Sequence, residues 1–163
     1  MNNFWNHLEA ARAGNGPMAP SANPAKLKQV LDKLTVLEVE SFCKEFYSKL
    51  IELNRWDLWG AGYVITGGMS DDSFHYFRSW IIGKGKECYE VALADPNGLS
   101  RFIDDAEVDN ELLEYASLQV LESRGSKSDP TSEIAESADD EPKGEAFDED
   151  TVEERFPALV GLS

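Results

Sequence analysis

The sequence predicts an all-α protein: a single compact bundle of about six to eight short helices with an acidic, partly disordered C-terminal tail. Apolar residues recur at the three- and four-residue spacing of a helical face over most of the first 125 positions. No run alternates with a period of two for long enough to indicate a strand. The length of 163 residues fits one domain, because a domain commonly holds about 100–200 residues.

The first three helices are predicted from their ends as well as from their apolar faces. An amphipathic stretch at residues 3–13 stops at Asn15-Gly16-Pro17, and Pro24 suits the first turn of a second helix. Thr35 and Glu38 form the pattern of a capping box, in which each side chain satisfies a free backbone amide of the other residue. The third helix therefore begins there and continues to about residue 53.

Residues 55–96 are expected to supply most of the core, because they contain three of the four tryptophans. A large aromatic side chain buries about 150–250 Å². The fourth helix falls in this stretch, where Gly60 and Gly62 leave room for another backbone to approach closely. Gly67-Gly68 supplies the left-handed stop of that helix.

The remaining helices are predicted from caps and breakers. Ser70 is a good N-cap for a fifth helix, and two aspartates follow in the first turn, where the helix dipole favours negative charge. Gly83-Lys84-Gly85 loosens or kinks this helix, and a sixth segment ends at Asp95-Pro96. After a short link, a last helix is expected to end near Gly125.

The negative charge is concentrated at the C-terminal end. The chain has 31 acidic and 15 basic residues, a net charge of −16, and residues 129–163 hold 12 acidic and 2 basic residues, a net of −10. Such sequence without apolar periodicity cannot bury enough surface to offset the entropy lost on ordering. We therefore predict a helical domain at residues 1–125, a disordered acidic linker at 126–146 and a short segment at 147–163 that docks on the domain.

Charge and composition exclude several classes of partner and location. A net charge of −16 argues against direct binding of nucleic acid or of an anionic membrane, since phosphate contacts need Lys and Arg. No stretch approaches the roughly 18 apolar residues of a membrane helix, and the N-terminus lacks the apolar run of a signal peptide. We expect a cytoplasmic protein in which Cys43 and Cys88 are reduced, buried hydrophobes.

No motif for catalysis, metal or cofactor binding is present. Gly60-Ala61-Gly62 and Gly83-Lys84-Gly85 lack the strand-loop-helix setting of a phosphate loop, and no Gly-x-Ser-x-Gly occurs. Asp71 and His75 are four residues apart on one helix face, but a metal site needs three or four ligands and the other histidine is His7. We predict no catalytic residue, metal or cofactor, and favour a protein that is not an enzyme.

Polar side chains nevertheless lie inside the aromatic stretch, which gives a set of candidate ligand-binding residues. The candidates are Trp56, Asp57, Trp59, Tyr63, Asp71, His75, Arg78 and Trp80. A structural alternative is a buried ion pair between Asp57 and Arg78 that ties the fourth helix to the fifth.

Three short motifs follow one another within residues 55–96. Trp-Asp-Leu-Trp-Gly, Gly-Gly-x-Ser-Asp-Asp and Phe-Arg-x-Trp occur in this order. With them the chain resembles the bacterial family described as domain of unknown function 4240. Phe4-Trp5 and the stretch at 148–157 are similar to the ends of that family, and the resemblance covers most of residues 3–163, most weakly at 115–140. It implies a compact, bacterial, cytoplasmic and mainly helical domain, and it supplies no catalytic residues.

Two classes of function follow from these observations. The preferred one is a non-catalytic acidic binding module that engages a basic protein partner, of the inhibitor or immunity type, because charge complementarity raises association rate and specificity. The alternative is a small-ligand binder or an enzyme that uses an aromatic cleft around Trp56, His75 and Arg78.

Overall fold

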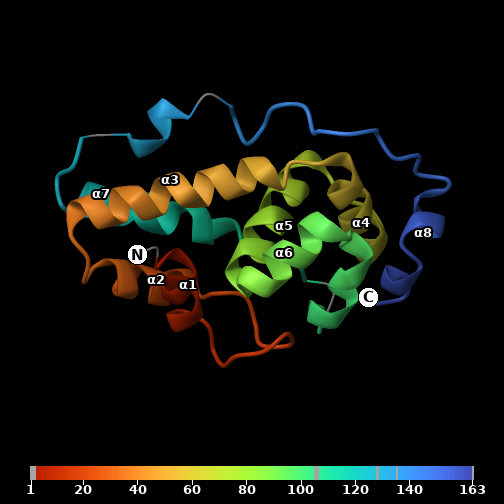
Figure 1. Cartoon of the computed structure of the whole chain (residues 1–163), viewed down its shortest axis with the longest axis horizontal. Helices are drawn as coiled ribbons and strands as arrows, with labels where there is room; N and C mark the ends of the chain where they lie inside the picture. The colour runs from red at the N-terminus through yellow and green to blue at the C-terminus, as the bar shows by residue number, and fades with distance from the viewer. Residues whose placement is uncertain (1–2, 105–106, 128, 135, 163) are drawn as a thin grey trace.

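Eight α-helices and four short 3₁₀ helices make up the described part of the chain, which a computed structural model gives for residues 3–104, 107–127, 129–134 and 136–162 (Figure 1). The α-helices are α1 (Phe4–Ala10), α2 (Pro24–Leu31), α3 (Val36–Glu52), α4 (Trp56–Thr66), α5 (Asp71–Lys84), α6 (Lys86–Ala94), α7 (Ala116–Ser123) and α8 (Val152–Arg155). The 3₁₀ helices are η1 (Pro96–Phe102), η2 (Glu111–Tyr115), η3 (Pro130–Glu133) and η4 (Pro157–Leu159). Among these residues no β-strand forms, so the all-α prediction is confirmed.

The two longest helices, α3 and α5, organise the contacts between elements, and α5 packs against α1, α3, α4, α6 and η2. α3 has 17 residues and packs against α5 and α7, and α7 also contacts α2. α6 packs against α5 and η1. In Figure 1 the chain leaves α7, runs along α3 and returns beside α4, which α8 contacts. The C-terminal residues are thus brought back to the helical body, which we define as residues 3–124.

Most predicted helix ends are present. Thr35 Oγ1 accepts a hydrogen bond from the backbone amide of Glu38 at 3.2 Å, and Glu38 Oε1 accepts one from the amide of Thr35 at 3.2 Å, which completes the capping box. Ser70 caps α5 through the amide three residues on, and Asn23 caps α2 in the same way. Gly67, with a φ of 73°, ends α4 in the left-handed conformation.

The chain between α5 and α7 departs from the prediction in two places. Gly85, with a φ of 109°, separates α5 from α6 completely instead of kinking one helix. The last helix that the sequence predicts is divided into η2 and α7. The short link predicted before that helix begins within the end of η1. Apolar spacing alone does not distinguish a 3₁₀ turn from an α-helical one in such short segments.

The two glycines of α4 are approached by side chains and not by another backbone. A Cβ atom on Gly60 would lie 3.1 Å from Val152 and 3.2 Å from Phe156. A Cβ on Gly62 would lie 2.5 Å from the sulfur of Met69. The prediction of close packing at these positions is confirmed, and the prediction of a neighbouring backbone is wrong.

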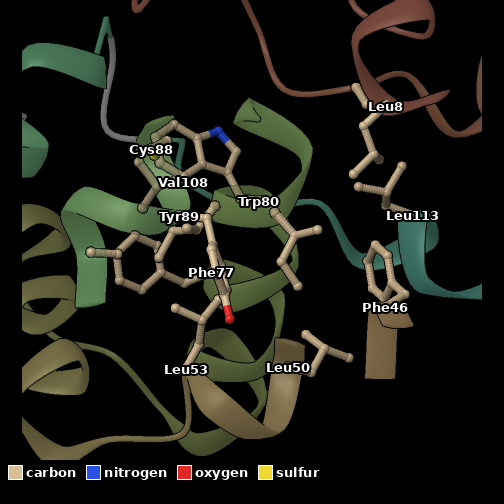
Figure 2. Close-up of a cluster of buried hydrophobic side chains, with 14 of the residues drawn as sticks. Leu8, Phe46, Leu50, Leu53, Phe77, Trp80, Cys88, Tyr89, Val108 and Leu113 are labelled. Carbon is tan, nitrogen blue, oxygen red and sulfur yellow. The ribbon is translucent and has the colours of Figure 1, made fainter. Parts of the chain in front are cut away.

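The core draws on every helix of the body, and the aromatic stretch contributes its centre (Figure 2). Phe77 is fully buried and Trp80 is 5% exposed, and their rings stack with centroids 6.1 Å apart in the cluster that also contains Leu50 and Leu53. Both cysteines are fully buried, and burial raises the pKa of the Cys88 thiol to about 12. No helix in the described part of the chain combines the length and apolarity needed to cross a bilayer.

The C-terminal tail contacts the body through three segments, the first of which is η3 packed against α3. Val152, Phe156 and Leu159 are buried, and their helices α8 and η4 contact α4 and η1. Residues 136–143, which we call the strap, contact the ends of α3 and α4 through polar groups described below. The three-part division of the chain at residues 125 and 146 stays a prediction, and residues 1–2, 105–106, 128, 135 and 163 lie outside the described part.

Candidate functional site

The eight candidate ligand-binding residues lie in several different places and do not line one site. Trp56 and Trp59 of α4 stack on each other with ring centroids 5.2 Å apart, and Tyr63 lies 5.4 Å from the ring of Phe147. Trp59 Nε1 also donates a hydrogen bond to the carbonyl of Met69 at 2.9 Å. These three aromatic residues therefore pack against each other and the returning tail.

Trp80 and Asp71 have structural neighbours of their own. Trp80 lies in the core, 6.1 Å from the ring of Phe77 and 5.2 Å from the Nζ of Lys84. Asp71 Oδ1 accepts a hydrogen bond from the amide of Asp72 in the first turn of α5. Among the described residues, no group of three or more His, Cys, Asp or Glu side chains gathers with the geometry of a metal site.

The prediction of an ion pair between Asp57 and Arg78 is wrong, because each side chain has other partners. Asp57 pairs with Arg55, two residues before it, at 3.2 Å, because both lie at the exposed start of α4. Arg78 is buried as expected, at 2% exposure, but its Nη1 donates to the carbonyls of Leu50 at 3.0 Å and Ala138 at 2.8 Å. The guanidinium therefore ties α5 to the end of α3 and to the strap.

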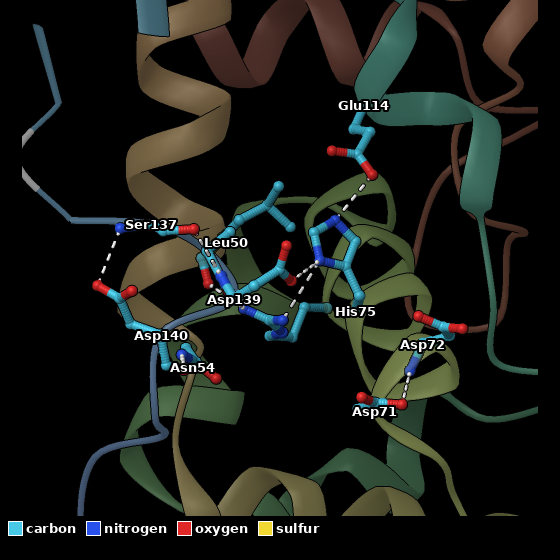
Figure 3. A network of polar contacts seen from close by, with 11 residues as sticks. Leu50, Asn54, Asp71, Asp72, His75, Glu114, Ser137, Asp139 and Asp140 are labelled. Atoms are coloured by element: carbon cyan, nitrogen blue, oxygen red, sulfur yellow. Dashed lines mark hydrogen bonds and ion pairs between the residues drawn. The ribbon is translucent and has the colours of Figure 1, made fainter. Parts of the chain in front are cut away.

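His75 is the centre of the polar network that remains (Figure 3). Its Nε2 lies 2.7 Å from Oε1 of Glu114, and its Nδ1 lies 3.0 Å from Oδ1 of Asp139. Nη2 of Arg78, which can only donate, lies 3.4 Å from the same Nδ1. The two shorter contacts, one carboxylate on each ring nitrogen, fit a doubly protonated imidazole that donates from both. The hydrogen bond with Glu114 raises the pKa of His75, although burial and the nearby charge of Arg78 lower it.

A cleft of about 470 Å³ opens beside this network. Its polar and aromatic lining consists of Tyr47, Asp72, His75, Tyr76, Glu114, Tyr115, Thr131, Glu136, Ser137 and Asp139. Three tyrosines and four carboxylates thus face one space, which no Lys or Arg of the described chain lines. Burial raises the pKa of Tyr47 and of Tyr76, and the charge of Glu114 raises that of Tyr115. The three phenols are therefore neutral near pH 7.

The arrangement is better suited to holding a positive charge than to moving a proton. Both ring nitrogens of His75 are engaged, so the ring cannot act on a ligand without losing a carboxylate partner. Ser137, a serine hydroxyl in the cleft, accepts a hydrogen bond from the amide of Asp139 within the strap. Nothing in this contact activates it as a nucleophile.

Sequence reasoning found His75 but missed its partners. Glu114 and Asp139 lie 39 and 64 positions away in the chain, and Asp139 falls in the segment expected to be disordered. Tyr47 and Tyr115 sit at the borders of apolar helical faces, which is the one signal the sequence offered for them.

Comparison with known proteins adds a family and no relatives of known function. Residues 1–124 match the family model described as Protein of unknown function (DUF4240). No curated protein and no solved structure matches the chain. The matched range contains His75, Arg78 and Glu114 but not the strap, and the likeness expected at residues 148–157 stays a prediction.

Proposed function

We propose, from the premise that this chain belongs to the DUF4240 family of proteins of unknown function, that it is a non-catalytic acidic module that binds a basic protein partner. We further propose that this module is of the inhibitor or immunity type and acts in the bacterial cytoplasm. It binds neither nucleic acid nor membrane. The net charge of −16 supports the sign of the partner, because complementary charge steers association and opposes wrong partners.

The cleft beside His75 carries this proposal. Carboxylates and aromatic rings both attract a cation, and here four of the former and three of the latter line one space. The volume of about 470 Å³ lies within the roughly 300–1,000 Å³ of common ligand pockets. The charge of His75 is offset by Glu114 and Asp139 on either side. A Lys or Arg side chain of the partner is the chemistry that fits.

The alternative of an aromatic cleft for a small ligand or a reaction lacks a comparable observation. It requires Trp56, His75 and Arg78 to face one space. In the described part of the chain, the cleft beside His75 is lined by neither Trp56 nor Arg78. Trp56 instead stacks on Trp59, and Arg78 donates to backbone carbonyls.

Binding of a tetralysine peptide to the full chain tests the proposal. Fully acetylated tetralysine, which has the same length but no side-chain charge, is the control probe. We expect calorimetry to detect binding of the charged peptide at low salt and progressive weakening as salt rises. The reason is that exposed charges are screened beyond a Debye length of about 8 Å at physiological salt.

Two charge-matched double variants locate the bound peptide. Asp72→Asn with Glu136→Gln removes two exposed carboxylates that line the cleft, whereas Glu153→Gln with Glu154→Gln removes two exposed carboxylates of α8. We expect the cleft variant to weaken binding about tenfold and the α8 variant to weaken it less than about threefold. An equal loss in both variants, or no binding to the unaltered chain, would contradict the proposal.

A further inference from the structure

The strap is held to the body almost entirely through its backbone. The carbonyl of Ala138 accepts from Arg78 Nη1 at 2.8 Å, and the carbonyl of Asp140 accepts from Asn54 Nδ2 at 2.6 Å. Lys143 donates its amide to the carbonyl of Asn54 at 2.9 Å and accepts from the amide of Trp56 at 2.9 Å. An isolated parallel bridge between Arg55 and Lys143 records the same pairing. The strap is thus an extended segment bound by main-chain groups.

The body groups that hold the strap are buried and need a partner. Arg78 is 2% exposed and Asn54 is 5% exposed. No carboxylate of the described chain lies within ion-pair distance of Arg78, and its Nε has no hydrogen-bond partner there. A buried polar group left without a hydrogen bond typically costs about 1–3 kcal/mol, and a charged one costs more. The body therefore favours an occupant at this place.

Two positions of the strap also fit the body through side chains. Ala138 is 8% exposed, which leaves little room for a larger residue there. Asp139 reaches Nδ1 of His75 at 3.0 Å, and Figure 3 shows it pointing toward the ring from the strap side. The body faces the strap with the guanidinium of Arg78 and the imidazole of His75. The strap itself carries four acidic residues and one lysine.

We propose that Asn54, Trp56, His75 and Arg78 form a groove that binds an extended acidic peptide of a partner protein, and that the strap occupies this groove as an intramolecular ligand. The peptide presents a small residue followed by an aspartate, as Ala138 and Asp139 do. All four groove residues lie within the range matched by the family, whereas the strap lies outside it. The groove residues and their occupant therefore differ in whether the family match covers them.

This inference concerns a ligand of opposite charge from that of the proposed function and does not rest on that function, although His75, Ala138 and Asp139 border both the groove and the cleft. It is a case of recognition by main-chain pairing, in which backbone hydrogen bonds give affinity and side-chain pockets give specificity. A tethered segment competes at an effective concentration in the millimolar range. A free peptide consequently binds well only after the strap has been displaced.

Two single variants of the full chain separate the groove from its occupant. Ala138→Arg places a large charged side chain at a buried strap position and leaves every groove residue unchanged. Ala146→Arg makes the same substitution at an exposed position of the tail. Circular dichroism checks that both variants keep their helical content.

The probe is a fluorescein-labelled peptide of residues 136–143, Glu-Ser-Ala-Asp-Asp-Glu-Pro-Lys, followed by fluorescence anisotropy. We expect the Ala138→Arg chain to bind it at least about tenfold more tightly than the unaltered chain or the Ala146→Arg chain, because the internal competitor has been removed. Equal affinity for all three chains, or no binding by the Ala138→Arg chain, would overturn the proposal.

Changes in the peptide test specificity without altering the protein. A peptide carrying Ala138→Arg and one carrying Asp139→Asn should each bind the Ala138→Arg chain at least about fivefold more weakly than the natural peptide. A peptide of the same composition in scrambled order that binds as well as the natural one would also overturn the proposal. If these peptide assays fail, the tetralysine result still stands. If tetralysine does not bind, the result of the peptide assays still stands.

Discussion

The helical body and the strap are held in place by different kinds of contact. In the body, side chains such as Phe46 and Phe77 are fully buried against other helices, and apolar area removed from water stabilises the fold by about 25 cal/mol per Å². In the strap only Ala138 is buried, and hydrogen bonds from Arg78 and Asn54 carry the attachment. The apolar packing of the body holds its helices strongly, but a single substitution in it costs much stability. The hydrogen bonds to the strap backbone can be made by another peptide segment.

The end of the tail is held by buried apolar side chains, as the helices of the body are. Val152 and Leu159 are fully buried and Phe156 is 4% exposed, although residues 147–163 hold five acidic residues and one arginine. Acidity by itself therefore does not decide how a segment is held. The difference lies in whether apolar side chains recur at a spacing that lets one face pack.

The largest loss of stability is expected when a large side chain is removed from the core of the body. Phe77→Ala should lower the free energy of unfolding by about 3–5 kcal/mol, because it removes a fully buried ring and leaves a cavity. Leu112→Ala, at a side chain that is 60% exposed, should lower it by less than about 0.5 kcal/mol. Urea unfolding followed by circular dichroism measures both. Similar losses in the two variants would contradict the burial described for Phe77.

A smaller and more local effect is expected at the end of the tail. Leu159→Ala should weaken docking of η4 on η1 by about 2–3 kcal/mol, since the side chain is fully buried. Limited proteolysis should then cut residues 144–151 faster, while the helical signal of the body stays unchanged. Val160→Ala, at a neighbouring residue that is 47% exposed, is the control. If the control were cut as fast as Leu159→Ala, the tail would not be held by this side chain.

The contact between His75 and the strap predicts a dependence of stability on pH. In the folded chain Glu114 and Asp139 raise the pKa of His75 above its ordinary value of 6.5, so protonation favours the folded state. This contribution is complete below about pH 6.5 and is lost as pH rises through the folded-state pKa.

Urea unfolding of the unaltered chain and of His75→Gln, between about pH 6 and about pH 9, checks this prediction. The stability difference between the two chains should shrink as pH rises, because glutamine does not titrate. A difference that stays constant, or grows, would show that the imidazole is not held as a cation by its two carboxylates.

The smallest effect is expected at the exposed pair of α4. Asp57→Ala should lower the free energy of unfolding by less than about 1 kcal/mol, because Asp57 and Arg55 are 26% and 38% exposed and solvent screens their attraction. The double variant Arg55→Ala with Asp57→Ala completes the cycle and isolates the pair. A loss of about 3–5 kcal/mol would instead indicate a buried pair.

Local signals in the sequence were sufficient for much of the fold. The capping box of Thr35 and Glu38, the glycine stop at Gly67 and the cap at Ser70 each act within a few residues, so their effect is readable from the chain itself. The short 3₁₀ helices were missed because their residues carry no distinct periodicity.

The candidate site was much less predictable, because polar contacts between distant segments leave no periodic trace. His75 was identified from its setting, but Glu114 and Asp139 reach it from 39 and 64 positions away. The partner expected for Arg78 was the nearest conspicuous carboxylate in the aromatic stretch, Asp57. The actual acceptors are the backbone carbonyls of Leu50 and Ala138, and any residue type provides a carbonyl.

The position of the strap has a thermodynamic consequence for the two binding surfaces. Residues Glu136 to Asp139 form one wall of the cleft, and Ala138 and Asp139 at the same time fill the groove. A peptide that displaces the strap takes away Glu136 and Asp139, two of the four carboxylates that line the cleft, and restores a carboxylate at the position of Asp139. A peptide without an acidic residue at the position of Glu136 therefore leaves the cleft with one carboxylate fewer. By linkage, such a peptide and a cation bound in the cleft oppose each other by the same factor, and the two ligands are expected to be negatively cooperative.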